Sequence, residues 1–412
     1  MKIFIAAVAF FFAGALNAQW DTLNTGTGIK FNCVSFADAT IGVVCGLNPS
    51  TDSGACGQIY ITSNRGDNWF LLPFAAHEKN REIHDAAFTP EVQLWTVRDS
   101  GTVVLQHVWS VSYTSVSELS QYSLYCCFAV NDSVFYCAGE NGIAFRTFDY
   151  GVTWDTMNSE TTTNINDIYF ADAANGWIVA DGGYLAVTAD SGSTWTFIPQ
   201  PQWGFTDFMG FAYQDTVGLN PYIVGEAGAG LFSINGGVNW FGFPTNTVND
   251  IHKIRFINTT GGLMCGDNGY ISRTIEGGGW WFDDPSPVAA DLFDIAYAGD
   301  TTAFICGDSG VVLRSRMDIS SVEQPSSPSM AARAFPNPTS GPLFVEVMLS
   351  AESNVTVEIV DLLGQVIQTN YYEHVGSGVN RFECSTGDLA TGVYFMRVVA
   401  NEQVVTMPVI RN

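Results

Sequence analysis

The chain has 412 residues, of which 41 are acidic and 16 are basic, so its formal net charge is −25. Proteins that bind nucleic acid need a basic face for the phosphates, and this balance argues against that class of partner. The excess of carboxylates favours solubility and cationic or neutral partners, and the length allows two or three domains.

Residues 1–18 have the pattern of a secretory signal peptide. The segment opens with Lys2, continues with an apolar core over residues 4–15 and ends at the small residue Ala18. The alternative is a membrane anchor, but a spanning helix needs about 20 apolar residues and this core is shorter. No later stretch of the sequence is apolar for that length. We therefore predict an exported chain whose mature form starts at Gln19 and has no transmembrane segment.

A repeated unit then fills the first three quarters of the chain, and its clearest copy is residues 164–199. Seven turn glycines mark the repeats: Gly57, Gly101, Gly142, Gly183, Gly228, Gly269 and Gly310. Successive glycines are 41 to 45 residues apart, which is the spacing of propeller blades. Each repeat holds four short β-rich runs separated by turns, which predicts a four-stranded meander that must stack on its neighbours.

The seventh repeat lacks its closing strand. A tryptophan follows six of the glycines: Trp69, Trp109, Trp154, Trp195, Trp240 and Trp281. The missing strand stands at the other end of the chain, where residues 19–23 read Gln-Trp-Asp-Thr-Leu. We predict that this N-terminal strand completes the last blade. Residues 19–317 then form an all-β, seven-bladed propeller with short, protected edges.

The hairpin that ends each unit resembles the Asp-box, or BNR repeat, with the pattern Ser/Thr-x-Asp-x-Gly-x-Thr-Trp. Two copies are complete, at residues 147–154 and 188–195, and three others carry Asn64, Asn235 or Glu276 in place of the Asp. An Asp or Asn caps backbone N–H groups of its own turn, Gly takes the positive φ and Trp buries a large area. The structural box residues are Asp149, Gly151, Trp154, Asp190, Gly192, Trp195, Trp69, Trp240 and Trp281. The resemblance implies a structural turn, away from any active site.

Residues 19–316 are also similar to the photosystem II assembly-factor-like propellers, a branch of the Asp-box group. The shared patterns are a strand of the type Asp-Ile-x-Phe, here residues 167–170, and one of the type Gly-Trp-x-Val, here residues 176–179. The resemblance implies a non-enzymatic binding propeller, and we expect a protein or glycan ligand. The photosynthetic role is not carried over.

A sialidase-like glycoside hydrolase is the alternative function, because those enzymes also combine propellers with Asp-boxes. They need three arginines that grip one carboxylate, since the guanidinium pairs with it in a bidentate manner. Three arginines follow their turn glycines by four residues, on the strand that leads to the Asp-box side of the repeat: Arg146, Arg273 and Arg314. Arg98 and Arg255 lie elsewhere in the repeat. No arginine triad can be assembled from these positions, so we predict that the chain is not an enzyme.

Acidic residues recur at two places in the repeat. Two residues before the turn glycine, six repeats carry Asp99, Glu140, Asp181, Glu226, Asp267 or Asp308. The first strands carry Asp85, Asp167, Asp207, Asp250 and Asp294. Both sets should line one mouth of the propeller channel, where focused carboxylates would attract an amine or a divalent cation. The alternative is turn chemistry and solubility alone. We expect no other cofactor, and we read His84 and His252 as ordinary residues rather than metal ligands.

Nine cysteines in an exported chain permit disulfides but leave one thiol unpaired. Cys45 and Cys56 flank an insertion in the first repeat, and a bridge between them would fasten that loop. The other reading is that the cysteines are small buried apolar residues.

The last quarter of the chain loses the repeat. Residues 318–333 are a Ser/Pro-rich linker with too few apolar residues to fold. Residues 334–412 alternate apolar and polar positions in short runs, which predicts a small antiparallel, Ig-like β-sandwich.

Three motifs of this segment resemble the type A C-terminal sorting domain of the type IX secretion system. They are residues 335–341 (Phe-Pro-Asn-Pro-Thr-Ser-Gly), 357–367 and 389–397. The resemblance implies a Bacteroidota-type bacterium and export by the type IX machinery to the outer-membrane surface or the medium. The alternative is an ordinary adhesive Ig-like domain.

Overall fold

The structure is a computed structural model, and it describes residues 20–48, 56–72, 81–108, 113–199, 206–214, 220–299, 302–315, 330–335, 339, 341–349, 351–361, 365–387, 389–400 and 403–411. The signal-peptide prediction, Gln19, Trp109 and most of the proposed linker lie outside these residues. The chain divides into two compact units, Met1–Val322 and Glu323–Asn412. Within the described ranges, no helical segment has the length and apolar character needed to cross a membrane.

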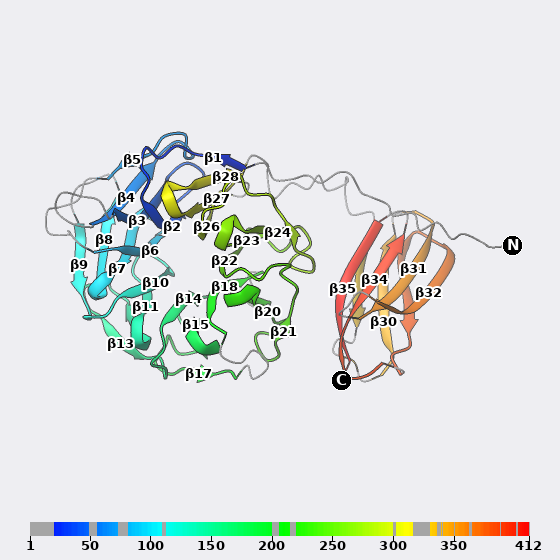
Figure 1. The fold of residues 1–412 in the computed structure, drawn as a ribbon. Coiled ribbons are helices and arrows are strands. Elements are labelled where there is room, and N and C mark those ends of the chain that lie inside the picture. The colour runs from blue at the N-terminus through cyan, green and yellow to red at the C-terminus, as the bar shows by residue number, and fades with distance from the viewer. Residues whose placement is uncertain are drawn as a thin grey trace. The chain divides into compact units, whose positions relative to one another are not determined.

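Seven four-stranded antiparallel sheets form the first unit and stand around a ring, which makes it a seven-bladed propeller as predicted (Figure 1). Blade 1 is β2 (Lys30–Phe36), β3 (Gly42–Asn48), β4 (Cys56–Thr62) and β5 (Phe70–Leu71). Blade 2 is β6 (Ile83–Phe88), β7 (Gln93–Arg98), β8 (Thr102–His107) and β9 (Tyr113–Glu118). Blade 3 is β10 (Leu124–Ala129), β11 (Phe135–Gly139), β12 (Ile143–Thr147) and β13 (Asp155–Asn158). Blades 4 and 5 are β14 (Ile165–Phe170), β15 (Gly176–Ala180), β16 (Tyr184–Thr188) and β17 (Thr196–Phe197); and β18 (Phe208–Tyr213), β19 (Pro221–Gly225), β20 (Gly230–Phe232) and β21 (Phe241–Gly242).

The last two blades complete the ring. Blade 6 is β22 (Ile251–Phe256), β23 (Gly262–Gly266), β24 (Ile271–Thr274) and β25 (Phe282–Asp283). Blade 7 is β26 (Leu292–Ala298), β27 (Thr302–Gly307), β28 (Val312–Ser315) and, outermost, β1 (Trp20–Thr22). In six blades a 3-10 turn joins the second and third strands: η1 (Asp99–Gly101), η2 (Glu140–Gly142), η3 (Asp181–Gly183), η5 (Glu226–Gly228), η6 (Asp267–Gly269) and η7 (Asp308–Gly310).

The N-terminal strand β1 closes the ring by antiparallel pairing with β28, with Trp20 opposite Ser315 and Thr22 opposite Leu313. In Figure 1 the dark-blue β1 lies beside the yellow-green end of the propeller. Trp20 is 5% exposed and packs in a core cluster with Leu263 and Leu313, which belong to blades 6 and 7. The strand therefore fills the same place between two blades as the box tryptophans do elsewhere.

The Asp-boxes are hairpin turns whose side chains cap their own backbone. In the box of blade 3, Asp149 Oδ1 accepts the Thr153 N–H at 2.8 Å and Asp149 Oδ2 accepts the Thr153 hydroxyl at 2.6 Å. These bonds lower the pKa of the Asp149 carboxyl. Gly151 has φ +77°, and a Cβ there would lie 2.9 Å from Trp95 of the preceding blade. The box is thus both a turn and a contact between blades.

Degenerate boxes keep this cap when the replacement still offers an amide oxygen. Asn64 Oδ1 accepts the Asn68 N–H at 3.0 Å, and Asn235 Oδ1 accepts the Asn239 N–H at 2.9 Å. The cap uses one acceptor oxygen, so Asn replaces Asp without loss of the bond.

The Cys45–Cys56 bridge does not form. Cys45 lies opposite Ile59 on one side and Cys33 on the other, whereas Cys56 lies opposite Asn48. Cys45 and Asn48 are three residues apart on one strand, which separates the two sulfurs by roughly 10 Å along it. All nine cysteines are free thiols in the structure.

The second unit contains two antiparallel sheets around one core. One has the order β29 (Met330–Phe335), β30 (Leu343–Leu349), β33 (Gly378–Cys384), and the other β32 (Val366–Val375), β31 (Ser353–Val360), β34 (Gly392–Ala400), β35 (Gln403–Arg411). Alternate residues of both sheets, among them Val345, Val357 and Val398, are buried in the same cluster. The predicted β-sandwich is confirmed.

Deleting residues 19–24 should open the propeller, because no other strand of the described chain pairs with the outer edge of β28. We expect a sharp fall in the melting temperature of the propeller, measured by differential scanning calorimetry. Trp20→Ala alone should cost about 3–5 kcal/mol, as for other buried tryptophans.

The control is Phe70→Ala, in the equivalent outer strand of blade 1. Phe70 is 62% exposed, so its loss should change stability by at most about 0.5 kcal/mol. A deletion variant that melts at the wild-type temperature would show that β1 does not hold the ring closed.

Candidate functional site

One residue of every innermost strand bulges into the central channel. The strand next to the channel in each blade shifts register by one residue against its neighbour, so one residue per blade has no partner across the ladder. We call these seven residues the bulge ring: Asn32, His84, Tyr125, Asn166, Met209, His252 and Phe293. All seven line one cavity of about 400 Å³ together with Lys30 and Asp181. We call this cavity the mouth.

A layer of buried charges lies beneath the bulge ring. Asp85, Asp167, Lys253 and Asp294 each follow the bulge residue of their blade, and Arg255 stands two residues after Lys253. We call these five residues the charged layer. Asp85 and Asp294 line both the mouth and a second cavity of about 300 Å³, which Arg255 also lines. The charged layer therefore separates two cavities along the channel.

The three aspartates of the charged layer join neighbouring blades. Asp85 Oδ1 accepts the N–H of Ala86 at 2.8 Å, and its Oδ2 accepts that of Cys127 in the next blade at 2.9 Å. Asp167 repeats the arrangement with Ile168 at 3.1 Å and Phe211 at 2.9 Å. Each carboxylate thus satisfies one amide of its own blade and one of the next. We call this contact the carboxylate clasp.

Asp294 makes the contact with the next blade across the closure of the ring. Its Oδ2 accepts the N–H of Val34, in blade 1, at 2.9 Å. The first and last blades are therefore held at the channel by Asp294 and at the rim by β1. This contact spans 260 positions of the chain.

Lys253 supplies the positive charge of the layer by reaching past a whole blade. Its Nζ lies 3.2 Å from Asp167 Oδ1, with the side chains 10% and 7% exposed. Lys253 belongs to blade 6 and Asp167 to blade 4, and Gly210 holds the equivalent position in blade 5 between them. A Cβ on Gly210 would lie 3.2 Å from the Cα of Lys253. The glycine therefore allows the innermost strands of blades 5 and 6 to approach closely.

The electrostatics of the layer follow from burial and from the balance of charge. Burial raises the pKa of Asp85 to about 6, although Lys253 opposes this. Burial also raises the pKa of Asp294, against the effect of Lys253 and Arg255. For Lys253, burial disfavours the charge, but Asp167, Asp294 and Asp85 together raise its pKa. Three carboxylates face two cations, and the raised pKa of Asp85 favours its protonated form.

The five first-strand acids predicted to act together are separated in the structure. Asp85, Asp167 and Asp294 belong to the charged layer. Asp207 and Asp250 precede their strands, and they accept the turn N–H groups of Gly182 and Ala227, each at 2.8 Å. They cap the 3-10 turn of the preceding blade. Asp207 and Asp250 therefore fit the alternative prediction, in which the acids serve to cap turns.

The six turn acids each begin a 3-10 turn, and several bind a residue of the bulge ring. Asp99 Oδ1 lies 2.8 Å from His84 Nε2, and Asp267 Oδ1 lies 2.7 Å from His252 Nε2. Asp181 Oδ1 accepts from Asn166 at 2.7 Å. Glu140 accepts the Ser123 N–H at 3.1 Å and Asp308 that of Ser309 at 2.7 Å, while Glu226 is exposed. These acids orient the mouth and add negative charge around it.

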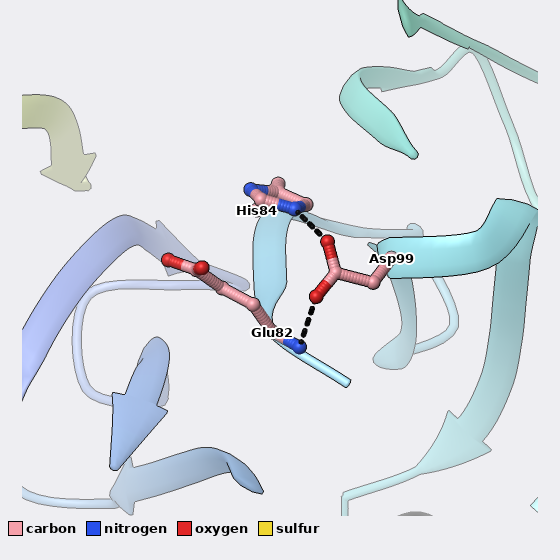
Figure 2. Close-up of side chains that lie close together, drawn as sticks. All are labelled: Glu82, His84 and Asp99. Carbon is pink, nitrogen blue, oxygen red and sulfur yellow. Dashed lines mark hydrogen bonds and ion pairs between the residues drawn. The ribbon is translucent and has the colours of Figure 1, made fainter. Parts of the chain in front are cut away.

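Glu82, His84 and Asp99 form a group whose ligand atoms lie within 4.8 Å of one another (Figure 2). Asp99 Oδ2 also accepts the backbone N–H of Glu82 at 3.0 Å, and Glu82 Oε1 accepts from Asn32 at 2.7 Å. The hydrogen bond to Asp99 uses His84 Nε2, which is the nitrogen nearest the carboxylate. A metal ion here would have to displace these bonds, so the geometry describes a hydrogen-bonded cluster.

The arginines that a sialidase would need do not meet. Arg146 binds Ser191 O at 2.6 Å and Arg314 binds Asp67 at 2.6 Å, so each joins a blade to the box of the next. Arg273 lies 3.9 Å from Asp284, and Arg255 is in the channel. These positions give no common carboxylate site.

Lys253→Met keeps the apolar stem but removes the ammonium that faces three buried carboxylates. We expect the free energy of unfolding at pH 8 to fall by about 3 kcal/mol, as when one partner of a buried pair is removed. Without the ammonium, the pKa values of Asp85 and Asp294 in the folded state rise further above their unfolded values. The lost stability should therefore return as the pH falls from 8 to 5, measured by urea titration.

Lys30→Met is the matched control, because Lys30 lines the mouth but is exposed. It should change the stability by at most about 0.5 kcal/mol at either pH. Equal losses for Lys253→Met at pH 5 and pH 8 would contradict the charge balance described above.

Comparison with known families supports both units. The model of the photosystem II assembly factor YCF48 matches residues 150–281, and that of the secretion-system C-terminal sorting domain matches residues 333–412. No curated protein matches the chain.

Solved structures show the same propeller fold. "YCF48 bound to D1 peptide" is similar with a TM-score of 0.60 and 17% identity, over 72% of this chain and 96% of that one. YCF48 from Cyanidioschyzon merolae has a TM-score of 0.58 and 16% identity, over 72% and 99%. The WD40 repeats of RRP9 have a TM-score of 0.59 at 8% identity, over 73% and 98%. The chain combines a propeller with repeats of the photosystem II assembly factor YCF48 type and a C-terminal secretion-system sorting domain.

Proposed function

We propose that this protein is an exported binding propeller that holds a cationic segment of a protein ligand at the mouth. The sorting domain indicates secretion and a cell-surface or extracellular location. The observation that carries the proposal is the mouth itself, a cavity of about 400 Å³ lined by one bulge residue from every blade. A cavity of this size suits a few side chains of a peptide rather than a whole domain.

The lining of the mouth favours a positive group. Tyr125 and Phe293 offer aromatic faces, and the ammonium of Lys30 already lies 4.6 Å from the centre of the Phe293 ring. Aromatic faces attract ammonium and guanidinium groups through their quadrupole. The turn acids around the mouth raise the local concentration of cations. A lysine or arginine side chain meets both requirements.

Two further observations support a binding role. The similar solved structure "YCF48 bound to D1 peptide" is a propeller with a bound peptide. Arg146 and Arg314 join blades to one another, which gives no support to the sialidase-like alternative. A glycan could also stack on the aromatic residues of the mouth, and the experiment below separates the two ligand classes.

Hexalysine is a suitable probe, with hexaglutamate and a panel of neutral and sialylated glycans as comparisons. We expect hexalysine to bind the full chain and to bind more weakly as salt is raised, because the attraction is electrostatic. Tyr125→Ala and Asp181→Asn should weaken binding by roughly 5- to 10-fold, or about 1–1.4 kcal/mol. Isothermal titration calorimetry measures these affinities.

Asp149→Asn in a box of blade 3 is the control, since it lies outside the mouth and should leave the affinity unchanged. Binding of a glycan but not of hexalysine would support the glycan class instead. Hydrolysis of a sialoside would support the enzyme, and binding that survives both mouth substitutions would move the site elsewhere on the propeller.

We also propose that the second unit directs the chain through the type IX machinery of a Bacteroidota-type cell to the outer-membrane surface. A chain that ends at residue 329 lacks the whole sandwich but keeps the propeller. We expect this truncated protein to fold and to accumulate in the periplasm, as detected by cell fractionation and immunoblotting. Surface display of the truncated protein at the wild-type level would rule out this role.

A further inference from the structure

Two pairs of cysteines face each other across adjacent strands of the propeller. Cys33 of β2 lies opposite Cys45 of β3, and Cys127 of β10 lies opposite Cys137 of β11. Each pair is buried, with exposures of 1% and 0% for the first and 7% and 0% for the second. Each pair joins the first and second strands of its own blade, blade 1 or blade 3, but the two pairs differ in their position along the ladder.

The hydrogen bonds place Cys127 and Cys137 at a position where the two residues do not bond each other. The Val130 N–H donates to Val134 O at 3.0 Å, which makes Val130 and Val134 a hydrogen-bonded pair. Such pairs alternate with non-bonded ones along an antiparallel ladder, so Cys127 and Cys137, three positions on, are non-bonded. The Cys127 N–H confirms this because it donates to Asp85 of the previous blade.

Cys33 and Cys45 lie at the other kind of position. The Ala37 N–H donates to Ile41 O at 2.9 Å, so Ala37 and Ile41 are a hydrogen-bonded pair. The pair Cys33 and Cys45 lies four positions from it along the ladder. Because the two kinds of pair alternate, Cys33 and Cys45 are also a hydrogen-bonded pair. Opposed Cα atoms are about 4.5 Å apart at non-bonded positions and about 5.5 Å apart at bonded ones. The Cβ atoms are likewise closer at the non-bonded positions. A disulfide needs Cβ atoms about 3.5–4.5 Å apart. Ladder position alone therefore favours Cys127 and Cys137, while the Cys33 thiol makes a side-chain hydrogen bond with Cys45.

The two thiols also point to the same side of the blade. Cys127 and Cys137 belong to one core cluster with Phe135 and Phe145, whereas the adjacent Cys126 packs in a different cluster. Burial raises the pKa of the Cys127 thiol, and the Asp85 carboxylate raises it further. Because the thiolate is the reactive form, exchange in the folded protein is slow. A bond between the two must therefore form while the blade is folding.

We propose that Cys127 and Cys137 form a disulfide in the exported protein. The sorting domain indicates that the chain leaves the cytoplasm, and exported chains meet oxidising conditions. The oxidant is a disulfide, either of low molecular weight or in an oxidoreductase. One thiolate attacks it to give a mixed disulfide and release one thiol, and the second thiolate displaces the other thiol. Both cysteine protons are lost and two electrons pass to the oxidant.

Peptide mapping of the full chain, purified after export, tests the bond directly. The protein is denatured without reductant, its free thiols are alkylated with iodoacetamide, and it is cut with an Asp-specific protease. Asp132 lies between Cys127 and Cys137, and Asp38 lies between Cys33 and Cys45, so the cut separates the members of both pairs. We expect peptides containing Cys127 and Cys137 to remain joined until a reductant adds two hydrogen atoms.

Two variants assign the bond to its residues. Cys126→Ala should keep the joined peptides, because Cys126 faces another cluster, and Cys137→Ala should leave Cys127 alkylated. Reduction should also lower the melting temperature of the wild type by roughly 5 °C, as expected for a closed loop of this length. Alkylation of both Cys127 and Cys137 in the exported wild type would overturn the proposal. So would a bridge between Cys33 and Cys45 with Cys127 free.

Discussion

The propeller depends on the way in which the innermost amides of its blades are satisfied. A strand that borders the channel has a neighbour on one side only, so half of its N–H groups point into the channel. Buried amides without an acceptor are costly. Asp85 and Asp167 each supply acceptors to two adjacent blades at once, and Asp294 supplies one to the first blade. The same bonds that satisfy the amides therefore fix the angle between blades.

That arrangement has an electrostatic cost, and two cationic residues of the channel offset part of it. Three buried carboxylates repel one another, and burial disfavours each charge. Lys253 and Arg255 enter the layer and offset part of that cost. The bulge ring above the layer, by contrast, carries few charges. The bulge ring thus lies above the structural charges, of which Asp85, Lys253 and Asp294 also line the mouth.

The sequence predicts the fold well because every repeat carries its own local signals. The turn glycine, the box and the tryptophan each act within a few residues, and their spacing gives the period. Counting seven glycines against six tryptophans was enough to assign Trp20 to the last blade, where it lies. The sandwich follows from strand alternation alone. These features depend on short-range chemistry, which a single sequence displays.

The channel and the cysteine pairs were harder to predict because they depend on register. Asp207 and Asp250 look like first-strand acids, but each lies one residue before its strand and caps a turn. Lys253 stands three residues after Asp250, just as Asp294 stands three residues after Asp291. An alignment of the repeats on Asp250 and Asp291 therefore places Lys253 at the same position as Asp294, in the charged layer. Proximity in sequence suggests a pair of Cys45 and Cys56, but the neighbour of Cys45 across the ladder is Cys33. A shift of one residue changes every such assignment.

The placement of β1 has a consequence for the order in which the molecule folds. Trp20 and Ser315 are paired, although nearly 300 residues separate them in the chain. A contact of that span is slow to form, because the loop between its ends must lose much of its freedom first. The first blade is synthesised well before its neighbour in blade 7 exists, so the newly made chain stays an open arc. The ring can close only when both ends of the propeller are in the same compartment.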